Sequence, residues 1–63
     1  MTWDEAIHLA DALAATPDAG AWHIGVAAVP EAQGYVVVAR KHGHHDMHYL
    51  GSTEEFTALC DRL

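Results

Sequence analysis

The sequence predicts one α+β domain spanning residues 1–63, in which a three-stranded antiparallel β-meander is flanked by an N-terminal and a C-terminal helix (α-β-β-β-α). Three observations predict this fold. Two capping sequences each precede a helical pattern of apolar residues, and an alternating apolar pattern lies between them. The connections are also too short for the crossovers that parallel strands need. A chain of 63 residues has room for one small core only.

The two helices are expected where a Thr or Ser precedes a Glu by three positions, because the hydroxyl and the carboxylate can each accept from the other residue's backbone N–H. Residues 2–5 and 52–55 have this form. Pro17 should end the first helix near Thr16. The second helix carries apolar residues at the spacing of one helix face: Phe56, Leu59, Cys60 and Leu63.

Strands are expected at residues 21–28, 35–41 and 46–50, with turns at 30–34 and 42–45 between them. The first alternates apolar and other residues, as a half-buried strand does. The second is apolar on both faces, which predicts the central strand. Packing both helices on one face of the sheet is the compact solution. The expected core consists of Ile7, Leu13, Trp22, Ile24, Val26, Val37, Met47, Phe56 and Leu59.

The charge is strongly unbalanced, with nine Asp and Glu against three Lys and Arg and a net charge of −6. Residues 1–39 contain five acids and no Lys or Arg. Such a domain should repel nucleic acid and attract basic surfaces, so we expect a protein partner and neither nucleic acid nor membrane. A lone Cys60, with no signal peptide and no membrane span, predicts a cytoplasmic protein.

The acidic residues are the candidate binding site. Those in the first turns of the two expected helices are also favoured by the helix dipole, which is a structural explanation for them. Asp11, Asp18 and Glu31 have no such local reason, and with Asp4 two of them recur every seven residues. We expect these carboxylates to act as phosphate surrogates that face Lys or Arg of a basic groove. The predicted set is Asp4, Glu5, Asp11, Asp18, Glu31, Glu54 and Glu55.

A histidine-rich segment offers an alternative site. His42, His44, Asp46 and His48 would share one face if the segment were extended, and imidazole is a common ligand of zinc, copper or nickel. Gly43 and the expected turn argue against that, so an exposed turn is the preferred interpretation and no cofactor is expected. Protonation of all six histidines would bring the formal charge from −6 to 0. Binding that depends on negative charge should therefore weaken as the pH falls.

Nothing in the sequence predicts an enzyme. Ser52 is expected to cap a helix, and Cys60 falls on an apolar helix face, where an inert thiol is usual. Glycine-rich phosphate loops, HExxH and CxxC are absent. The element order resembles that of the double-stranded-RNA-binding domain. That family has basic residues at the start of its last helix, however, and here the residues are Ser52-Thr53-Glu54-Glu55.

Size, charge, a single thiol and two capped helices around a three-stranded sheet together resemble the small acidic inhibitors made by phages, in particular anti-CRISPR proteins that mimic DNA. The resemblance implies an inhibitor in the bacterial cytoplasm, a monomer or small homo-oligomer, that occupies the DNA-binding groove of a CRISPR effector. Two alternatives remain. One is an antitoxin-like or accessory subunit that binds through an apolar patch containing Trp3 or Tyr49, and the other is a histidine-rich metal-binding module.

Overall fold

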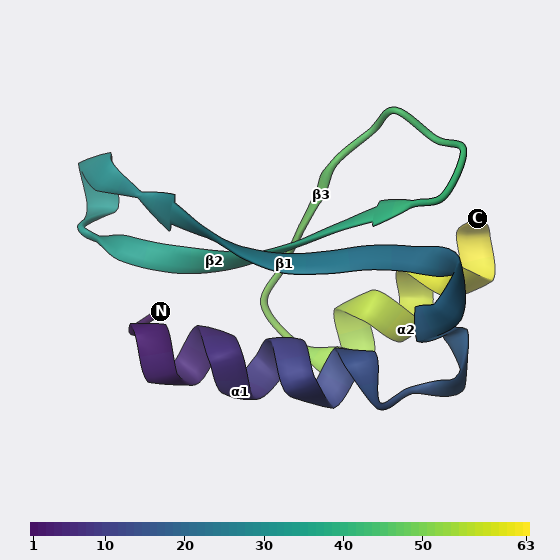
Figure 1. Cartoon of the computed structure of the whole chain (residues 1–63), viewed down its shortest axis with the longest axis horizontal. Coiled ribbons are helices and arrows are strands. Elements are labelled where there is room, and N and C mark those ends of the chain that lie inside the picture. The colour runs from purple at the N-terminus through teal and green to yellow at the C-terminus, as the bar shows by residue number, and fades with distance from the viewer.

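The computed structural model describes all 63 residues and confirms the α+β fold class and the element order (Figure 1). Two short 3₁₀ helices, η1 and η2, lie in the connections before β1 and after it. None of the helices is long and apolar enough to span a membrane. The elements are α1 (Trp3–Ala14), η1 (Pro17–Ala21), β1 (Trp22–Val29), η2 (Pro30–Ala32), β2 (Gly34–Lys41), β3 (His48–Leu50) and α2 (Thr53–Arg62).

Helix α1 begins with the reciprocal cap that its sequence predicts. The Thr2 hydroxyl accepts from the Glu5 backbone N–H at 3.2 Å, and the Glu5 carboxylate accepts from the Thr2 backbone N–H at 2.8 Å. Helix α2 keeps only half of this arrangement. Ser52 accepts from the Glu55 N–H at 3.2 Å, but the Glu55 carboxylate accepts from the N–H of Gly51, one residue before the cap. Both helix starts are therefore fixed by residues close in sequence.

The sheet has the order β1-β2-β3, so β2 is the central strand, as predicted. Strands β1 and β2 pair along their whole length, from Trp22 opposite Lys41 to Val29 opposite Gly34. Strand β3 makes only three pairs with β2, and the strand expected from residue 46 begins at His48 instead. The preceding residues form a turn with Gly43 at φ 83°, so the chain reaches β2 again only at His48.

The N-terminus is attached to the central strand. The Met1 ammonium donates to the Tyr35 carbonyl at 3.2 Å, and the Tyr35 N–H donates to the Met1 carbonyl at 2.8 Å. The Trp3 ring then packs edge-on against the Tyr35 ring, with 5.2 Å between the ring centroids. The start of α1 is thereby held beside β2.

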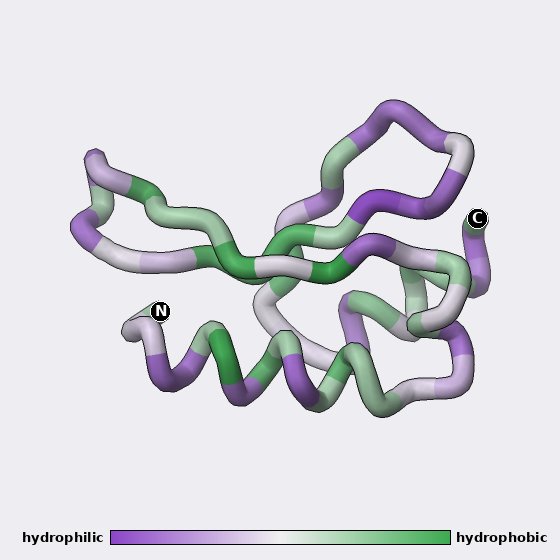
Figure 2. The backbone as a smooth tube through the Cα atoms, in the orientation of Figure 1, coloured by the Kyte–Doolittle hydropathy of each residue, from purple (hydrophilic) through white to green (hydrophobic).

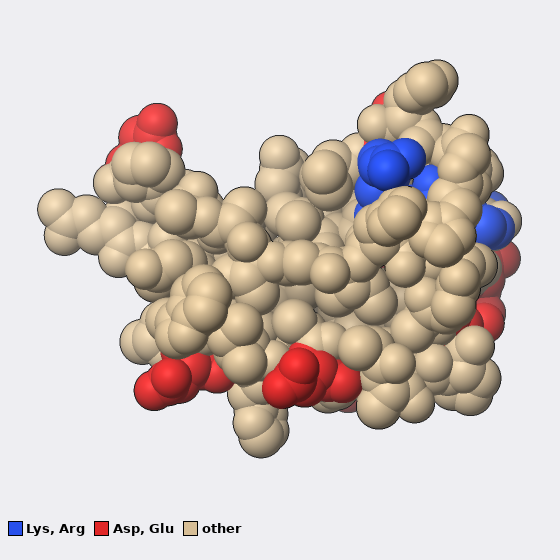
Figure 3. Space-filling view, viewed as in Figure 1, with Lys and Arg blue, Asp and Glu red and all other residues tan.

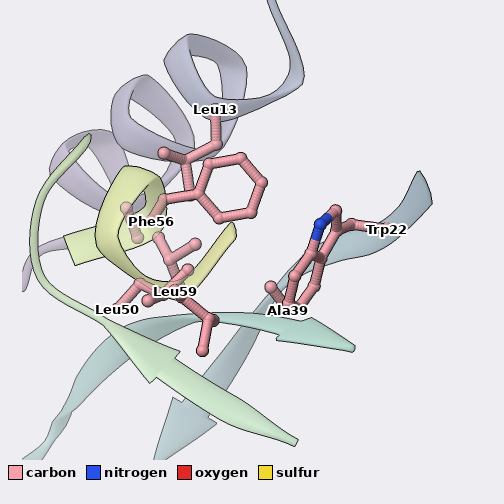
Figure 4. Packing of buried hydrophobic residues seen from close by; sticks show 8 residues of the cluster. Leu13, Trp22, Ala39, Leu50, Phe56 and Leu59 are labelled. Carbon is pink, nitrogen blue, oxygen red and sulfur yellow. The ribbon is translucent and has the colours of Figure 1, made fainter. Parts of the chain in front are cut away.

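Both helices cover the same face of the sheet, and the core lies between them and the strands (Figures 1 and 4). Phe56 of α2 lies in this core and packs edge-on against Trp22, with 5.5 Å between their ring centroids. Apolar residues lie along much of β1 and β2, whereas the turn before β3 is hydrophilic (Figure 2). The buried core residues are Ala6, Leu13, Trp22, Val37, Ala39, Leu50, Phe56 and Leu59.

Two of the predicted core residues lie elsewhere. Met47 is 48% exposed because it precedes β3 and belongs to the turn. Ile7 is only partly buried, since the inward position of that helical turn is taken by Ala6, one 100° step away. Ile24 and Val26 are partly buried and pack against the core from β1.

Candidate functional site

An acidic groove lies between α1 and the start of α2. It is open to solvent, has a volume of about 540 Å³, and takes its charge from the first turns of both helices. Figure 3 shows acidic side chains along α1, at the edge of the molecule opposite the turn before β3. The residues that line the groove are Asp4, Glu5, His8, Leu9, Ala12, Ser52, Thr53 and Glu54.

The carboxylates of Glu5 and Glu54 are held in the ionised form by local hydrogen bonds. The Thr2 backbone N–H, and then the Thr2 hydroxyl, lower the pKa of Glu5 below its usual value. The pKa of Glu54 is lowered by its own backbone N–H, followed by the hydroxyls of Thr53 and Ser52. The Thr53 hydroxyl donates to the Glu54 carboxylate at 3.3 Å. The first turns of both helices line the groove, and the partial positive charge of each helix N-terminus favours the anions of its own first turn.

The solvent-facing side of α1 continues the acidic surface. Asp4, His8 and Asp11 are all exposed and lie on one stripe of the helix, at i, i+4 and i+7. Asp4 and Asp11 are separated by about 10 Å along the helix axis at ~1.5 Å per residue. We call Asp4, Asp11 and Glu54 the acidic face, because these exposed carboxylates are not needed to cap either helix.

The structure separates the other predicted acids from the acidic face. Pro17 begins η1, so Asp18 lies beyond α1 and the seven-residue row does not continue on one helix. Glu31 lies in η2, at the tip of the β1–β2 hairpin. Glu55 is exposed, but its carboxylate accepts from the Gly51 N–H at 2.9 Å. Of the seven predicted residues, the groove brings together Asp4, Glu5 and Glu54.

The basic side chains lie apart from the acidic face (Figure 3), and two of the three make local hydrogen bonds. Arg40 donates to the main-chain carbonyl of His44 at 3.0 Å, and Lys41 donates to the main-chain oxygen of Leu63. Figure 3 shows the Lys and Arg side chains gathered near the C-terminus and the turn before β3. The acidic face is therefore separated from the Lys and Arg side chains, although other acidic side chains lie beside them (Figure 3).

The structure does not gather the histidine-rich segment into a cluster of metal-ligating side chains. The chain holds no group of three or more His, Cys, Asp or Glu side chains that could bind a metal ion. His48 is drawn into β3, where its ring packs edge-on against Trp22 with 6.0 Å between centroids. The ring of His42 instead lies against that of His23, at 4.1 Å. The sequence analysis missed this pair, although a hairpin register that joins residues 23 and 40 places it within reach.

Cys60 lies at the margin of the core. Burial raises the pKa of its thiol, and the nearby carboxylates of Asp18 and Asp61 raise it further. A thiol with a raised pKa holds its proton at neutral pH and is a poor nucleophile.

Comparison with known proteins adds no assignment to this geometry. No family of known proteins, no curated protein and no solved structure matches the chain.

Proposed function

We propose that this protein is an inhibitor that docks its acidic face into a basic, nucleic-acid-binding groove of another protein by mimicking the charge of DNA. The observation that carries the proposal is the acidic face itself. Its three carboxylates lie exposed on one helical surface, and the Lys and Arg side chains are gathered elsewhere. A basic groove would supply the cations that the chain lacks there.

The spacing of the acidic face supports the same proposal. Phosphates advance about 3.4 Å per step along one DNA strand, so a separation of about 10 Å corresponds to roughly every third phosphate. Asp4 and Asp11 have this separation on α1. Glu54 adds one further carboxylate across the groove, from α2.

Among such grooves, the one in a CRISPR effector is favoured by the resemblance to small phage inhibitors. The inhibitor would then compete with target DNA at the surface where the effector first contacts it. A partner of this class must have a groove that is wide enough for duplex DNA and rich in Lys and Arg.

The test compares two variants with the same change of charge. Asp11→Lys alters the acidic face, whereas Asp46→Lys alters an exposed acid in the turn before β3. Each protein is immobilised and used to capture proteins from a bacterial lysate, and bound proteins are eluted with duplex DNA. We expect wild type and Asp46→Lys to capture the same DNA-displaceable protein, and Asp11→Lys to capture at least about tenfold less. Equal capture by both variants, or capture that DNA does not displace, would contradict the proposal.

A second candidate function is an antitoxin-like or accessory subunit that binds through apolar side chains. The observation that favours it is the exposure of two aromatic residues, Trp3 at 52% and Tyr49 at 68%. Aromatic side chains are enriched among the residues that dominate protein interfaces. In the same capture assay, this function predicts that Tyr49→Ala lowers capture more than Asp11→Lys does, and that duplex DNA leaves the complex intact.

A further inference from the structure

The sheet face opposite the helices is apolar and uncovered. Trp22, Val37 and Leu50 point into the core, so their neighbours along each strand point the other way. None of these neighbours is among the residues that pack against the core. Tyr49, the largest of them, is 68% exposed. We call this surface the open sheet face, and it consists of Gly25, Ala27, Val29, Val36, Val38 and Tyr49.

The open sheet face contains a hollow and ends in opposite charges. A depression of about 430 Å³ is lined by Ala27, Val36 and Tyr49, and Glu31 forms part of its wall at the hairpin tip. At the other end of the same face, Arg40 pairs with His23 across the β1–β2 ladder. The face is therefore acidic at one end, apolar in the middle and basic at the other end.

We propose that a second copy of this chain covers the open sheet face in a two-fold symmetric dimer. Two sheets can pack face to face about 10 Å apart. A two-fold axis that runs across the strands reverses the strand direction, and so brings Glu31 of each copy to the Arg40 end of the other. An axis along the strands would instead bring Glu31 against Glu31. Charge complementarity selects the first arrangement.

The same rotation also determines where Tyr49, the exposed aromatic residue of this face, lies in the dimer. Tyr49 pairs with Val38, on one side of the centre of the face, and Val36 lies on the other side. The rotation exchanges these two levels and leaves the position across the strands unchanged, so the Tyr49 ring of each copy comes to lie on the β3 side of the other, beside its Val36 level. A large aromatic ring that becomes buried is a usual anchor of an interface.

Net charge does not prevent this association. The acidic face lies on the helical side of each copy, so in the dimer the two helical layers are outermost. Three layer spacings of about 10 Å separate them, which gives about 30 Å, or several Debye lengths at physiological salt. The footprint of the two eight-residue strands is about 27 by 10 Å, and the three residues of β3 add about 10 by 5 Å. Because this is less than the ~800 Å² per partner of a standard interface, we expect a weak dimer with a micromolar dissociation constant.

The test is sedimentation equilibrium of the purified protein over about 5 to 500 μM, the range suited to a weak interface. We expect a monomer–dimer equilibrium for wild type. Tyr49→Ala removes the largest side chain of the open sheet face and should raise the dissociation constant about tenfold. Trp3→Ala is the matched control, since it removes an exposed aromatic ring from the helical side. Circular dichroism confirms that each variant is folded.

A charge swap tests the direction of the axis. Arg40→Glu should weaken the dimer, and Arg40→Glu combined with Glu31→Arg should restore it. Within one chain the two positions lie at opposite ends of the hairpin, about 20 Å apart along the strands, so restoration requires a contact between copies. A wild-type protein that stays monomeric throughout would overturn the proposal. So would a dimer that neither Tyr49→Ala nor Arg40→Glu weakens, because it would form through another surface such as the free edge of β1.

Discussion

Individual side chains divide sharply into those that hold the fold and those that are available for binding. Phe56, Leu13 and Val37 are the largest fully buried side chains, and no polar or charged residue is buried. The core is therefore purely apolar, and each large side chain in it carries much of the stability of a small domain. The carboxylates of the acidic face are exposed and take no part in the core.

Substitutions of Phe56 and Met47 should have very different effects on stability. Phe56→Ala removes a buried ring and should cost about 3–5 kcal/mol of unfolding free energy, a large part of the ~3–9 kcal/mol expected for a chain of this size. Met47→Ala removes a side chain that is 48% exposed and should change it by less than about 1 kcal/mol. Urea denaturation followed by circular dichroism at low protein concentration measures both. A Met47→Ala loss as large as that of Phe56→Ala would contradict the position of Met47 in the turn.

At the level of elements, the first turns of both helices line the same groove, and both first turns contain acids. The first turn of α1 contains Asp4 and Glu5, and that of α2 contains Glu54 and Glu55. Each acid is favoured there by the helix dipole. Because the first turns of both helices line the acidic groove, acids that suit each helix separately also create a surface of one charge.

The cap of α1 should make stability depend on pH in a defined direction. The pKa of Glu5 is below its usual 4.5 in the folded protein because the Thr2 N–H donates to the carboxylate. This contribution is therefore present above pH 4.5 and is lost as the pH falls through the lowered pKa. Glu5→Ala should be less stable than wild type at pH 7, and the difference should vanish toward pH 3. Thermal unfolding of both proteins across this range is the measurement, and a constant difference would rule out the ionised cap.

At the level of the whole molecule, the layers separate the two kinds of surface. Both helices cover one face of the sheet and carry the acidic face (Figures 1 and 3). The strand register places mainly apolar residues on the other face of the sheet. A partner with a basic groove and a second copy of the chain would therefore occupy opposite sides. Both could bind at the same time.

The two surfaces should respond differently to salt. Contacts of the acidic face with a basic groove are screened by salt, so affinity for the captured DNA-binding protein should fall by about tenfold or more as salt is raised from low to high ionic strength. Burial of the open sheet face is mainly apolar and should change much less. Calorimetric titration of the partner and sedimentation of the protein alone, in the same salt series, measure the two effects. A partner affinity that does not change with salt would contradict binding through the acidic face.

The sequence by itself determined the local features of this protein. Thr2, Ser52 and Pro17 act on residues within a few positions of themselves, so the helix starts and the end of α1 could be predicted from spacing. The strand order β1-β2-β3 could be predicted because the connections are short. The excess of negative charge is a matter of composition alone. In the core, Leu13, Trp22, Val37, Phe56 and Leu59 were predicted correctly, because the helical and extended periods place them on inward faces.

Only the tertiary structure decided which distant residues meet. The pairing of β3 with β2 begins at His48, which left Met47 exposed and moved His48 away from a metal site and against Trp22. The packing of α2 beside α1 brought Glu54 into the same groove as Asp4. Asp18 and Glu31 lie outside that groove, in η1 and η2. The placement of both helices on one face left the other face of the sheet uncovered. These outcomes depend on contacts between residues far apart in sequence, and neither local propensity nor composition specifies such contacts.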